Sequence, residues 1–422
     1  MRGAAALIVT IVHYFGAFRP YSVFGNRSGF QQQSTWENLC HFPFFSTIFA
    51  GHFAVCLFFI LSGYVLSIHH FSRHVNRVKL FSAMVKRPIR LGGLVLFTVL
   101  LSALIQDQHL YFNAAASNIS SSQSWLGNFR VESRSSGSLL VDIVFRMFRS
   151  GVIYNPPLWT IEIELYGSLM VYSFLFFPEQ FRYRLAGLTA LSLAFQATNY
   201  LAFLLGMIAA VVEVQARGSQ RSVIKPAVSV SLIVVGVFLA GYPYYLEPVF
   251  RSSTMWGLLP EIDNFGGGYP MLAAVLLFCG VGANEQVQRW LDNTILRFIG
   301  RISFGLYAVH FILIGSFSSW LFVTLSGTVG REMAFWTVLT SGLVLNCAVA
   351  YLVTIWVDNP VVEMSAGVGR FVDCFLQSKL GQASVARTLR SSTLQSTESS
   401  ARCTKDAETL PCGIIGRMES IN

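Results

Sequence analysis

The chain has 422 residues, of which 53% are hydrophobic and only 12% are charged. Soluble domains carry about 25% charged residues, so this chain has too little charge to keep a large apolar core in water. The composition therefore excludes soluble, collagenous and small disulfide-rich proteins and indicates that lipid surrounds most of the surface. The net charge of +9 is more typical of basic loops on the cytoplasmic side of a membrane than of nucleic-acid binding.

Ten apolar segments are candidate membrane spans, because a bilayer core about 30 Å thick needs about 20 apolar residues per helix. The sequence therefore predicts an all-α, polytopic integral membrane protein with about ten transmembrane helices. A further segment, 139–153, contains arginines and an aspartate and predicts an amphipathic helix at the membrane interface. The ten segments are 4–18, 47–68, 89–106, 158–177, 183–198, 200–216, 226–246, 269–283, 303–325 and 334–357.

Basic residues are distributed unequally between the two sides that ten spans would define. With the N-terminus in the cytoplasm, most of the 30 lysines and arginines fall in cytoplasmic segments. This bias follows the positive-inside rule, and predicts cytoplasmic N- and C-termini in an endomembrane or the plasma membrane. Glycosylation sequons at Asn26 and Asn118 fall on the opposite side, as expected for a secretory-pathway membrane.

The composition changes from about residue 376 onward. The end of the chain is rich in serine, threonine and glutamine and poor in aromatic residues, so it cannot bury enough apolar surface to become ordered. The sequence predicts a membrane-embedded domain over 1–360 and a polar, disordered cytoplasmic tail over 361–422. The seven cysteines show no close spacing of the metal-ligand type, so no metal site is expected.

Two ionisable residues lie in the first span, where such groups are costly to bury and are therefore functional candidates. Arg2 and His13 lie eleven residues apart, so on a helix they share a face and are about 16 Å apart along the axis. Arginine can hold a phosphate, and neutral histidine can act as a general base or accept an acyl group. The simpler interpretation is an anchoring arginine and a histidine that makes one interhelical hydrogen bond.

Residues 1–18 also fit a secretory signal peptide loosely, because Arg2 precedes an apolar run. A histidine at the end of such a run is unusual in a signal peptide. We therefore favour a membrane span.

A basic segment, KRPIR, lies at the cytoplasmic mouth of the third span. Arg87 and Arg90 are three residues apart and share a helix face. They can set the topology of the chain, or they can bind a polyanionic cofactor that arrives from the cytosol. Pro88 fits the first turn of a helix, where its missing N–H is not needed, so we expect the helix to begin there.

Further ionisable residues lie in the fourth and ninth spans. In LWTIEIELYGS, Glu162 is favoured by the helix dipole, whereas Glu164 lies deeper and needs a partner, for which His13 or an arginine would serve. GRISFGLYAVH places a second histidine, His310, in the membrane, where a structural role is the simpler interpretation. Ser62, in FFILSGYVLS, is most simply a helix-packing residue, because no nucleophile elbow surrounds it.

Together, these motifs resemble those of the acyltransferase-3 family of polytopic membrane O-acyltransferases, in particular its fungal-type members. The resemblance rests on Arg2 and His13, which are separated by ten residues, followed in order by FFILSGYVLS, KRPIRL, LWTIEIELYGS, GRISFGLYAVH and VDNP. Two features depart from the family pattern. Gly93 stands where the family usually has proline, and Arg2 follows Met1 directly where the family usually has preceding residues.

The resemblance implies an enzyme that transfers an acyl group from acyl-CoA, loaded from the cytosol, to a hydroxyl of a carbohydrate, lipid or small-molecule acceptor. By analogy with the family, the acyl group is acetyl and the donor acetyl-CoA. A metal ion and nucleic acid are not expected among the partners. The implied site residues are His13, Arg2 and Glu164 for catalysis, Arg87 and Arg90 for the CoA donor, and Trp159 and His310 for substrate contact.

Other functions remain open at this point. Buried histidine, glutamate and arginine also form proton relays, so a proton-coupled membrane transporter is the alternative. Transporters usually contain two related halves with broken helices, and no repeat is evident between 1–200 and 200–360. A non-catalytic scaffold or receptor is the third interpretation.

Overall fold

The computed structural model describes residues 1–26, 30–71, 76–129, 148, 153–177, 180–218, 225–243, 246, 251, 254–260, 262 and 267–379. Over these residues every regular element is helical and no strand occurs, as the all-α prediction requires. The chain divides into two units, Met1–Val368 and a second that begins at Gly369. The predicted domain boundary at residue 360 stays a prediction. Most of the predicted interfacial helix 139–153, two residues of the Asn26 sequon and the tail from 380 onward lie outside the described residues.

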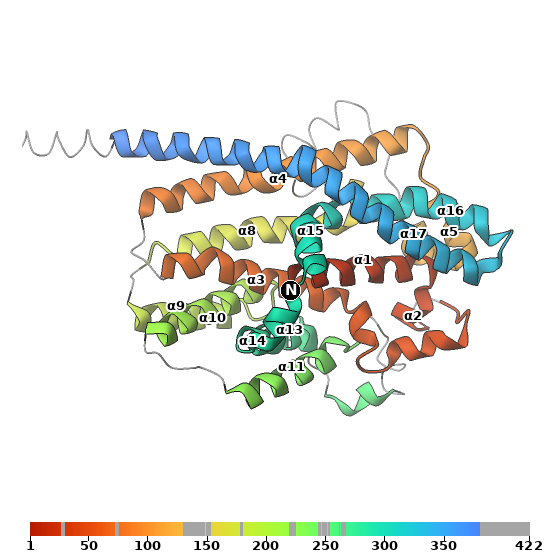
Figure 1. Ribbon diagram of the computed structural model, residues 1–422, viewed down its shortest axis with the longest axis horizontal. Helices are drawn as coiled ribbons and strands as arrows, with labels where there is room; N and C mark the ends of the chain where they lie inside the picture. Colours follow the sequence, from red (N-terminus) through yellow and green to blue (C-terminus); the bar gives the residue numbers. More distant parts are fainter. Residues whose placement is uncertain are drawn as a thin grey trace, which may run out of the picture. The chain divides into compact units, whose positions relative to one another are not determined.

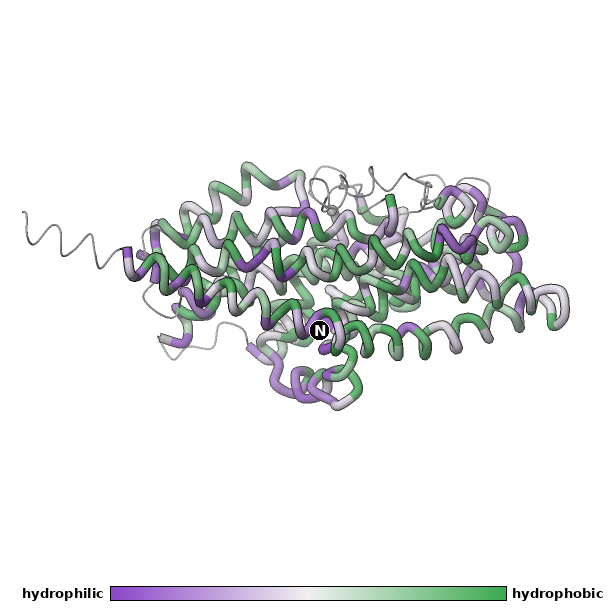
Figure 2. The backbone as a smooth tube through the Cα atoms, turned by 90° about the horizontal axis from the view of Figure 1, so that it is seen from above, coloured by the Kyte–Doolittle hydropathy of each residue, from purple (hydrophilic) through white to green (hydrophobic). Residues whose placement is uncertain are grey.

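The helices follow one another with mostly short connections, and hydrophobic residues run along most of them (Figure 2). In chain order they are α1 (Arg2–Phe18), α2 (Pro20–Phe24), η2 (Thr35–His41), η3 (Ser46–Phe49), α3 (Gly51–Phe71), α4 (Arg77–Asp107), α5 (Asn113–Ser120), η4 (Gln123–Gly127), η5 (Pro156–Leu158), α8 (Trp159–Phe174), α9 (Phe181–Ala194), α10 (Tyr200–Gly218), α11 (Pro226–Ala240), η6 (Met255–Leu258), α13 (Gly268–Gly282), α14 (Glu285–Leu291), α15 (Thr294–Leu313), η7 (Ile314–Ser318), α16 (Ser319–Ser326), α17 (Gly330–Val353) and η8 (Thr354–Asp358).

Several helical stretches are long and apolar enough to cross a membrane. The described residues contain five of them, and α13 with α14, bent by 102° at their junction, would make a sixth. Helices α1 and α11 are apolar but shorter. These helices are typical of a membrane protein, whereas the count of about ten spans stays a prediction. The five stretches are Gly51–Phe71, Arg77–Asp107, Tyr200–Arg217, Thr294–Ser326 and Gly330–Lys379.

Two helices begin well before the apolar segments that predicted them. Helix α4 begins at Arg77, although the apolar segment starts at 89, because the Asn76 side chain accepts hydrogen bonds from two N–H groups of the first turn. Pro88 therefore lies inside the helix, and the expectation that it marks the first turn is wrong. Helix α15 likewise begins at Thr294. Both first turns contain charged residues between apolar ones, so a search for continuous apolar segments does not reveal them.

Helix α1 lies among the other helices of the first unit (Figure 1). It packs against α15 and α3, and α3 packs in turn against α8, α10 and α13. At the beginning of α1, Gly3 lies so close to α15 that a Cβ there would be 2.7 Å from the carbonyl oxygen of Leu296. This contact holds the first turn of α1 against α15 and so places Arg2, which is itself partly exposed, beside the cavity described below.

Candidate active site

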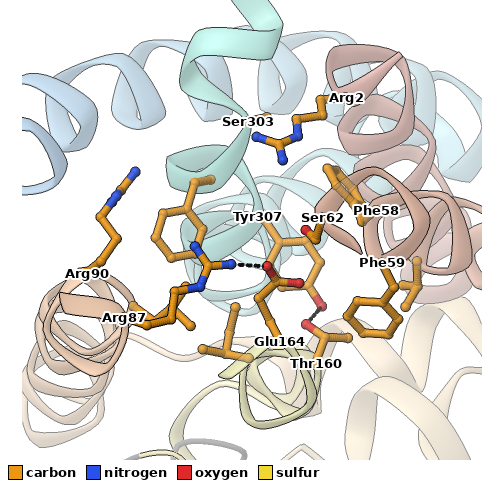
Figure 3. Close-up of a pocket in the computed structure, with 14 residues that line it drawn as sticks. Arg2, Phe58, Phe59, Ser62, Arg87, Arg90, Thr160, Glu164, Ser303 and Tyr307 are labelled. Carbon is orange, nitrogen blue, oxygen red and sulfur yellow. Dashed lines mark hydrogen bonds and ion pairs between the residues drawn. The ribbon is translucent and has the colours of Figure 1, made fainter. Parts of the chain in front are cut away.

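A cavity of about 170 Å³ lies between α1, α3, α4, α8 and α15 (Figure 3). Four residues selected from the sequence line it together, although they come from three separate helices. They are Arg2 from α1, Arg87 and Arg90 from α4, and Glu164 from α8. The other polar lining residues are Ser62, Thr160, Ser303 and Tyr307, and the apolar ones are Val55, Phe58, Phe59, Leu91, Ile161 and Phe304. We call this cavity the arginine pocket.

An ion pair between Arg87 and Glu164 crosses the arginine pocket (Figure 3). The Arg87 Nε also donates a hydrogen bond to Ser168 Oγ at 2.7 Å, and Ser62 lines the same cavity as Glu164. Of the two partners considered for Glu164, the structure therefore shows an arginine and not His13. The pair fixes the Arg87 guanidinium at the pocket wall.

The arginine pocket keeps an excess of positive charge. Arg90 forms an ion pair with Asp358, a residue of the VDNP motif that does not line the pocket. Glu164 and Asp358 thus balance two of the three arginines. Arg2 forms no ion pair or hydrogen bond with any residue in the described part of the chain, and its guanidinium points into the space between the helices (Figure 3). Such an arrangement suits an anionic ligand.

A tyrosine forms part of the pocket wall nearest to the histidines. The Tyr307 hydroxyl donates to the carbonyl oxygen of Pro157 at 2.6 Å and accepts a hydrogen bond from Thr160 Oγ1 at 2.7 Å. One helical turn further along α15, the ring of His310 has its centroid 5.8 Å from that of Tyr307. Tyr307 therefore separates the arginine pocket from the histidines.

His13 and His310 lie side by side beyond this tyrosine, with ring centroids 4.9 Å apart. The Nδ1 of His13 lies 2.6 Å from the carbonyl oxygen of Val9, and that of His310 lies 2.8 Å from the carbonyl oxygen of Tyr307. Because a carbonyl oxygen only accepts, both Nδ1 atoms carry the proton in the neutral rings, and each Nε2 keeps a free lone pair. We call these two residues the histidine pair.

Aromatic rings surround His13. The ring of Trp125, from η4, lies 5.8 Å from the His13 ring, and that of Phe311 lies 5.7 Å from it. Trp125 also contacts Phe311 at 5.7 Å. Sequence patterns do not predict the contact of Trp125 with His13, because Trp125 lies in a polar, serine-rich segment. The only signal in the sequence is a single tryptophan among these serines.

The predicted site residues thus fall into three groups. The arginine pocket contains Arg2 and the two α4 arginines with Glu164, whereas His13 does not line it. His13 and His310 form the adjacent pair. Trp159 belongs to neither group, since 39% of its surface is exposed and it does not line the pocket. No cluster of three or more histidine, cysteine, aspartate or glutamate side chains that could hold a metal ion occurs in the described ranges.

Comparison with known proteins identifies the chemistry to which this arrangement belongs. The family model of an acyltransferase domain matches residues 1–355, which include the arginine pocket and the histidine pair. The chain belongs to the acyltransferase-3 family. The resemblance seen in the sequence is therefore confirmed, and the chain is an acyltransferase enzyme.

The relatives of this acyltransferase include fungal enzymes. It is 23% identical to acyltransferase R4 from a Phoma species, in an alignment that covers 71% of this chain and 75% of that protein. It is also 23% identical to acyltransferase clz18 from Cochliobolus lunatus, over 69% of this chain and 73% of that protein. No solved structure matches the chain. Membership of this family favours the enzyme over the transporter and the scaffold.

Proposed function

We propose that this acyltransferase moves an acetyl group from acetyl-CoA to a hydroxyl of a carbohydrate, lipid or small-molecule acceptor. The observation that carries the proposal is the arginine pocket, whose lining residue Tyr307 has its ring 5.8 Å from that of His310 in the histidine pair. The phosphate groups of CoA match guanidinium groups, which bind phosphate oxygens through paired hydrogen bonds. The thioester at the other end of CoA is the group that a histidine would act on.

In this mechanism His13 is the general base. Its Nε2 takes the proton of the acceptor hydroxyl while the hydroxyl oxygen attacks the thioester carbonyl carbon. The carbon–sulfur bond breaks, and the sulfur of CoA leaves with the proton that the His13 imidazolium returns. The products are an ester of the acceptor and free CoA. The hydrogen bond to Val9 supports this role because it keeps the proton on Nδ1.

The other predicted residues have supporting roles in the proposal. Glu164 holds Arg87 in place, and Arg2 meets the donor phosphates together with Arg87 and Arg90. His310 contacts the substrate beside His13. Trp159, which does not line the pocket, has no role here.

A labelling experiment tests the proposal. Purified, detergent-solubilised protein is incubated with acetyl-CoA labelled in the acetyl group, together with a polysaccharide, a membrane lipid or a small alcohol in turn. We expect CoA release and labelled acceptor with wild type and with His69→Ala, a change of an exposed histidine at the end of α3. We expect neither with His13→Ala.

The same experiment separates two roles of His13. Label that stays on the protein, and is absent from His13→Ala, would assign His13 as an acyl carrier. Label that appears only in the acceptor supports the general base. Undiminished transfer by a correctly folded His13→Ala protein would refute both roles.

A further inference from the structure

A buried side chain that the proposed chemistry does not use is hydrogen-bonded to the stretch of α15 between Tyr307 and His310. Asn155 is fully buried, immediately before η5. Its Nδ2 donates a hydrogen bond to the carbonyl oxygen of Ala308 at 2.6 Å. Because that oxygen can only accept, the amide orientation is fixed, and Oδ1 faces away from the bond. Within the described ranges, Asn155 Oδ1 has no hydrogen-bond partner.

The position of Asn155 along α15 relates it to both parts of the site. Its side chain is hydrogen-bonded to Ala308, which directly follows the pocket-lining Tyr307 and lies two residues before His310. Pro157, two residues after Asn155, accepts the hydrogen bond of the Tyr307 hydroxyl. Asn155 therefore lies beside Tyr307, at a level of α15 between the pocket wall and His310.

A second buried atom without a partner lies on the same stretch of helix. His310 is fully buried, and no described residue forms a hydrogen bond with its Nε2. Since its Nδ1 carries the proton, Nε2 can only accept. An unpaired buried polar atom is costly, and most such atoms in folded proteins have a partner. The two acceptors lie on, or hydrogen-bonded to, the stretch of α15 that follows the pocket-lining Tyr307, so a ligand that extends from the pocket past Tyr307 could supply the missing donors.

The donor substrate has the matching groups. The pantetheine arm of CoA connects the phosphates to the thioester sulfur and carries amide N–H groups along its length. From Ser303, at the pocket, to His310 the rise along α15 is about 10 Å, and the arm has to cover this part of the route to reach His13. An arm that passes Tyr307 would bring amide N–H groups to the level of Asn155.

We propose that Asn155 Oδ1 accepts a hydrogen bond from an amide N–H of the pantetheine arm of acyl-CoA and so aligns the thioester with the histidine pair. This inference rests on the proposed use of acyl-CoA and adds a positioning residue to it. Asn155 touches the donor away from the reacting atoms. The nucleotide end of CoA, bound by arginines, does not depend on it.

Equilibrium binding tests the inference without knowledge of the acceptor. The affinities of purified, detergent-solubilised protein for acetyl-CoA and for adenosine 3′,5′-bisphosphate, which lacks the arm, are measured for wild type and Asn155→Leu. We expect Asn155→Leu to bind acetyl-CoA about tenfold more weakly, the usual effect of one lost hydrogen bond to a buried group. We expect its affinity for the bisphosphate to be unchanged.

Asn346→Leu is a matched control. Asn346 is also fully buried, donates to a carbonyl oxygen (that of Gly342) at 2.8 Å, and has an Oδ1 without a partner in the described part of the chain. It lies on α17 and does not line the arginine pocket. We expect Asn346→Leu to bind both ligands as wild type does.

Each other outcome has a definite meaning. Equal affinity of wild type and Asn155→Leu for acetyl-CoA would overturn the inference. The donor to Asn155 Oδ1 would then be an ordered water molecule and not the ligand. If Asn155→Leu loses both ligands through misfolding, wild type is tested with two acetyl-CoA analogues, in each of which an ester oxygen replaces one of the two amide N–H groups of the arm. About tenfold weaker binding of one of the analogues supports the inference, and binding of both analogues as tight as that of acetyl-CoA refutes it. Failure of wild type to bind acetyl-CoA at all would refute the proposed function itself.

Discussion

Single residues decide the chemistry of this acyltransferase through the partners that the fold gives them. The His13 ring has a defined tautomer because its Nδ1 meets the carbonyl oxygen of Val9, one turn earlier in the same helix. The Arg87 guanidinium has a defined place because Glu164 and Ser168 of α8 hold it. In the proposed mechanism, both arrangements hold these groups in place before a ligand binds, as preorganised catalysis requires.

Removal of the Glu164 charge should destabilise the ligand-free protein. In Glu164→Gln, Arg87 keeps its charge in a largely buried position, with 17% of its side chain exposed, beside the unpaired Arg2. We expect a loss of about 2–3 kcal/mol in the free energy of unfolding, somewhat below the range for a fully buried pair. Thermal unfolding in detergent, without acetyl-CoA, measures it.

Asp292→Asn is the control for this prediction. In the Asp292–Arg297 pair, Arg297 Nε lies 3.7 Å from Asp292 Oδ1, and more than half of each side chain is exposed. Loss of this pair should therefore change the free energy of unfolding by less than about 0.5 kcal/mol. Equal effects of the two substitutions would show that the Arg87–Glu164 pair does not stabilise the pocket.

His41, in the segment before α3, should make stability depend on pH. Burial lowers the pKa of this histidine below 6.5, so between its two pKa values the folded protein binds fewer protons than the unfolded chain. Stability should therefore fall as the pH decreases through about 6.5 and should not change above it on account of His41. Thermal unfolding of wild type and His41→Gln at pH 7.5 and pH 5.5 measures this contribution. An identical pH dependence in both proteins would contradict it.

Part of the site follows from the sequence, and part does not. Ionisable residues within or beside apolar segments pointed to Arg2, Arg87, Arg90 and Glu164, which the fold brings to one cavity, because such groups need a common polar environment in a membrane. Their roles stay predictions. The partner of Arg90, by contrast, is Asp358, 268 residues away in the chain. Such pairings depend on which helices become neighbours, and no local pattern encodes that choice.

At the scale of helices, glycines allow a close backbone contact between α3 and α10. A Cβ at Gly63 of α3 would lie 2.1 Å from the carbonyl oxygen of Phe203, and a Cβ at Gly206 of α10 would lie 2.2 Å from that of Ile60. The two backbones therefore touch at reciprocal glycines, as small residues permit in membrane helices. Since α3 also carries Ser62 and the phenylalanines of the arginine pocket, this contact supports the site.

Gly63→Ala should separate α3 from α10. The added methyl group meets rigid backbone, so we expect a loss of about 1–3 kcal/mol in the free energy of unfolding, or a smaller yield of monodisperse protein. Gly282→Ala is the matched control, because a Cβ there has no neighbour within 4 Å. Thermal unfolding in detergent compares the two variants. If both variants are as stable as wild type, the contact between α3 and α10 has room for a methyl group, which would contradict the prediction.

The existence of a helix was easier to predict from the sequence than the residues at which it begins and ends. The apolar segments 183–198 and 200–216 correspond closely to α9 and α10. The start of α4 was missed because capping by Asn76 makes a polar, charged first turn helical. Apolar runs predict which residues contact lipid or the protein core, whereas the position of a helix end depends on a few hydrogen bonds.

At the scale of the whole molecule, the charge distribution sets the expected topology. Most lysines and arginines fall on the side assigned to the cytoplasm, which would also open the arginine pocket toward cytosolic acetyl-CoA. We expect epitope tags at the N- and C-termini to be digested by protease added to sealed microsomes without detergent. Protection of either tag until detergent is added would contradict the predicted orientation.

The central claim is that the arginine pocket binds the acyl donor while His13 performs the transfer. The most direct test measures, for wild type and His13→Ala, both the affinity for acetyl-CoA and the rate of CoA release at saturating acetyl-CoA and acceptor. We predict that His13→Ala binds acetyl-CoA as wild type does and releases CoA about 10²- to 10⁴-fold more slowly. A His13→Ala protein that releases CoA at the wild-type rate would contradict the claim.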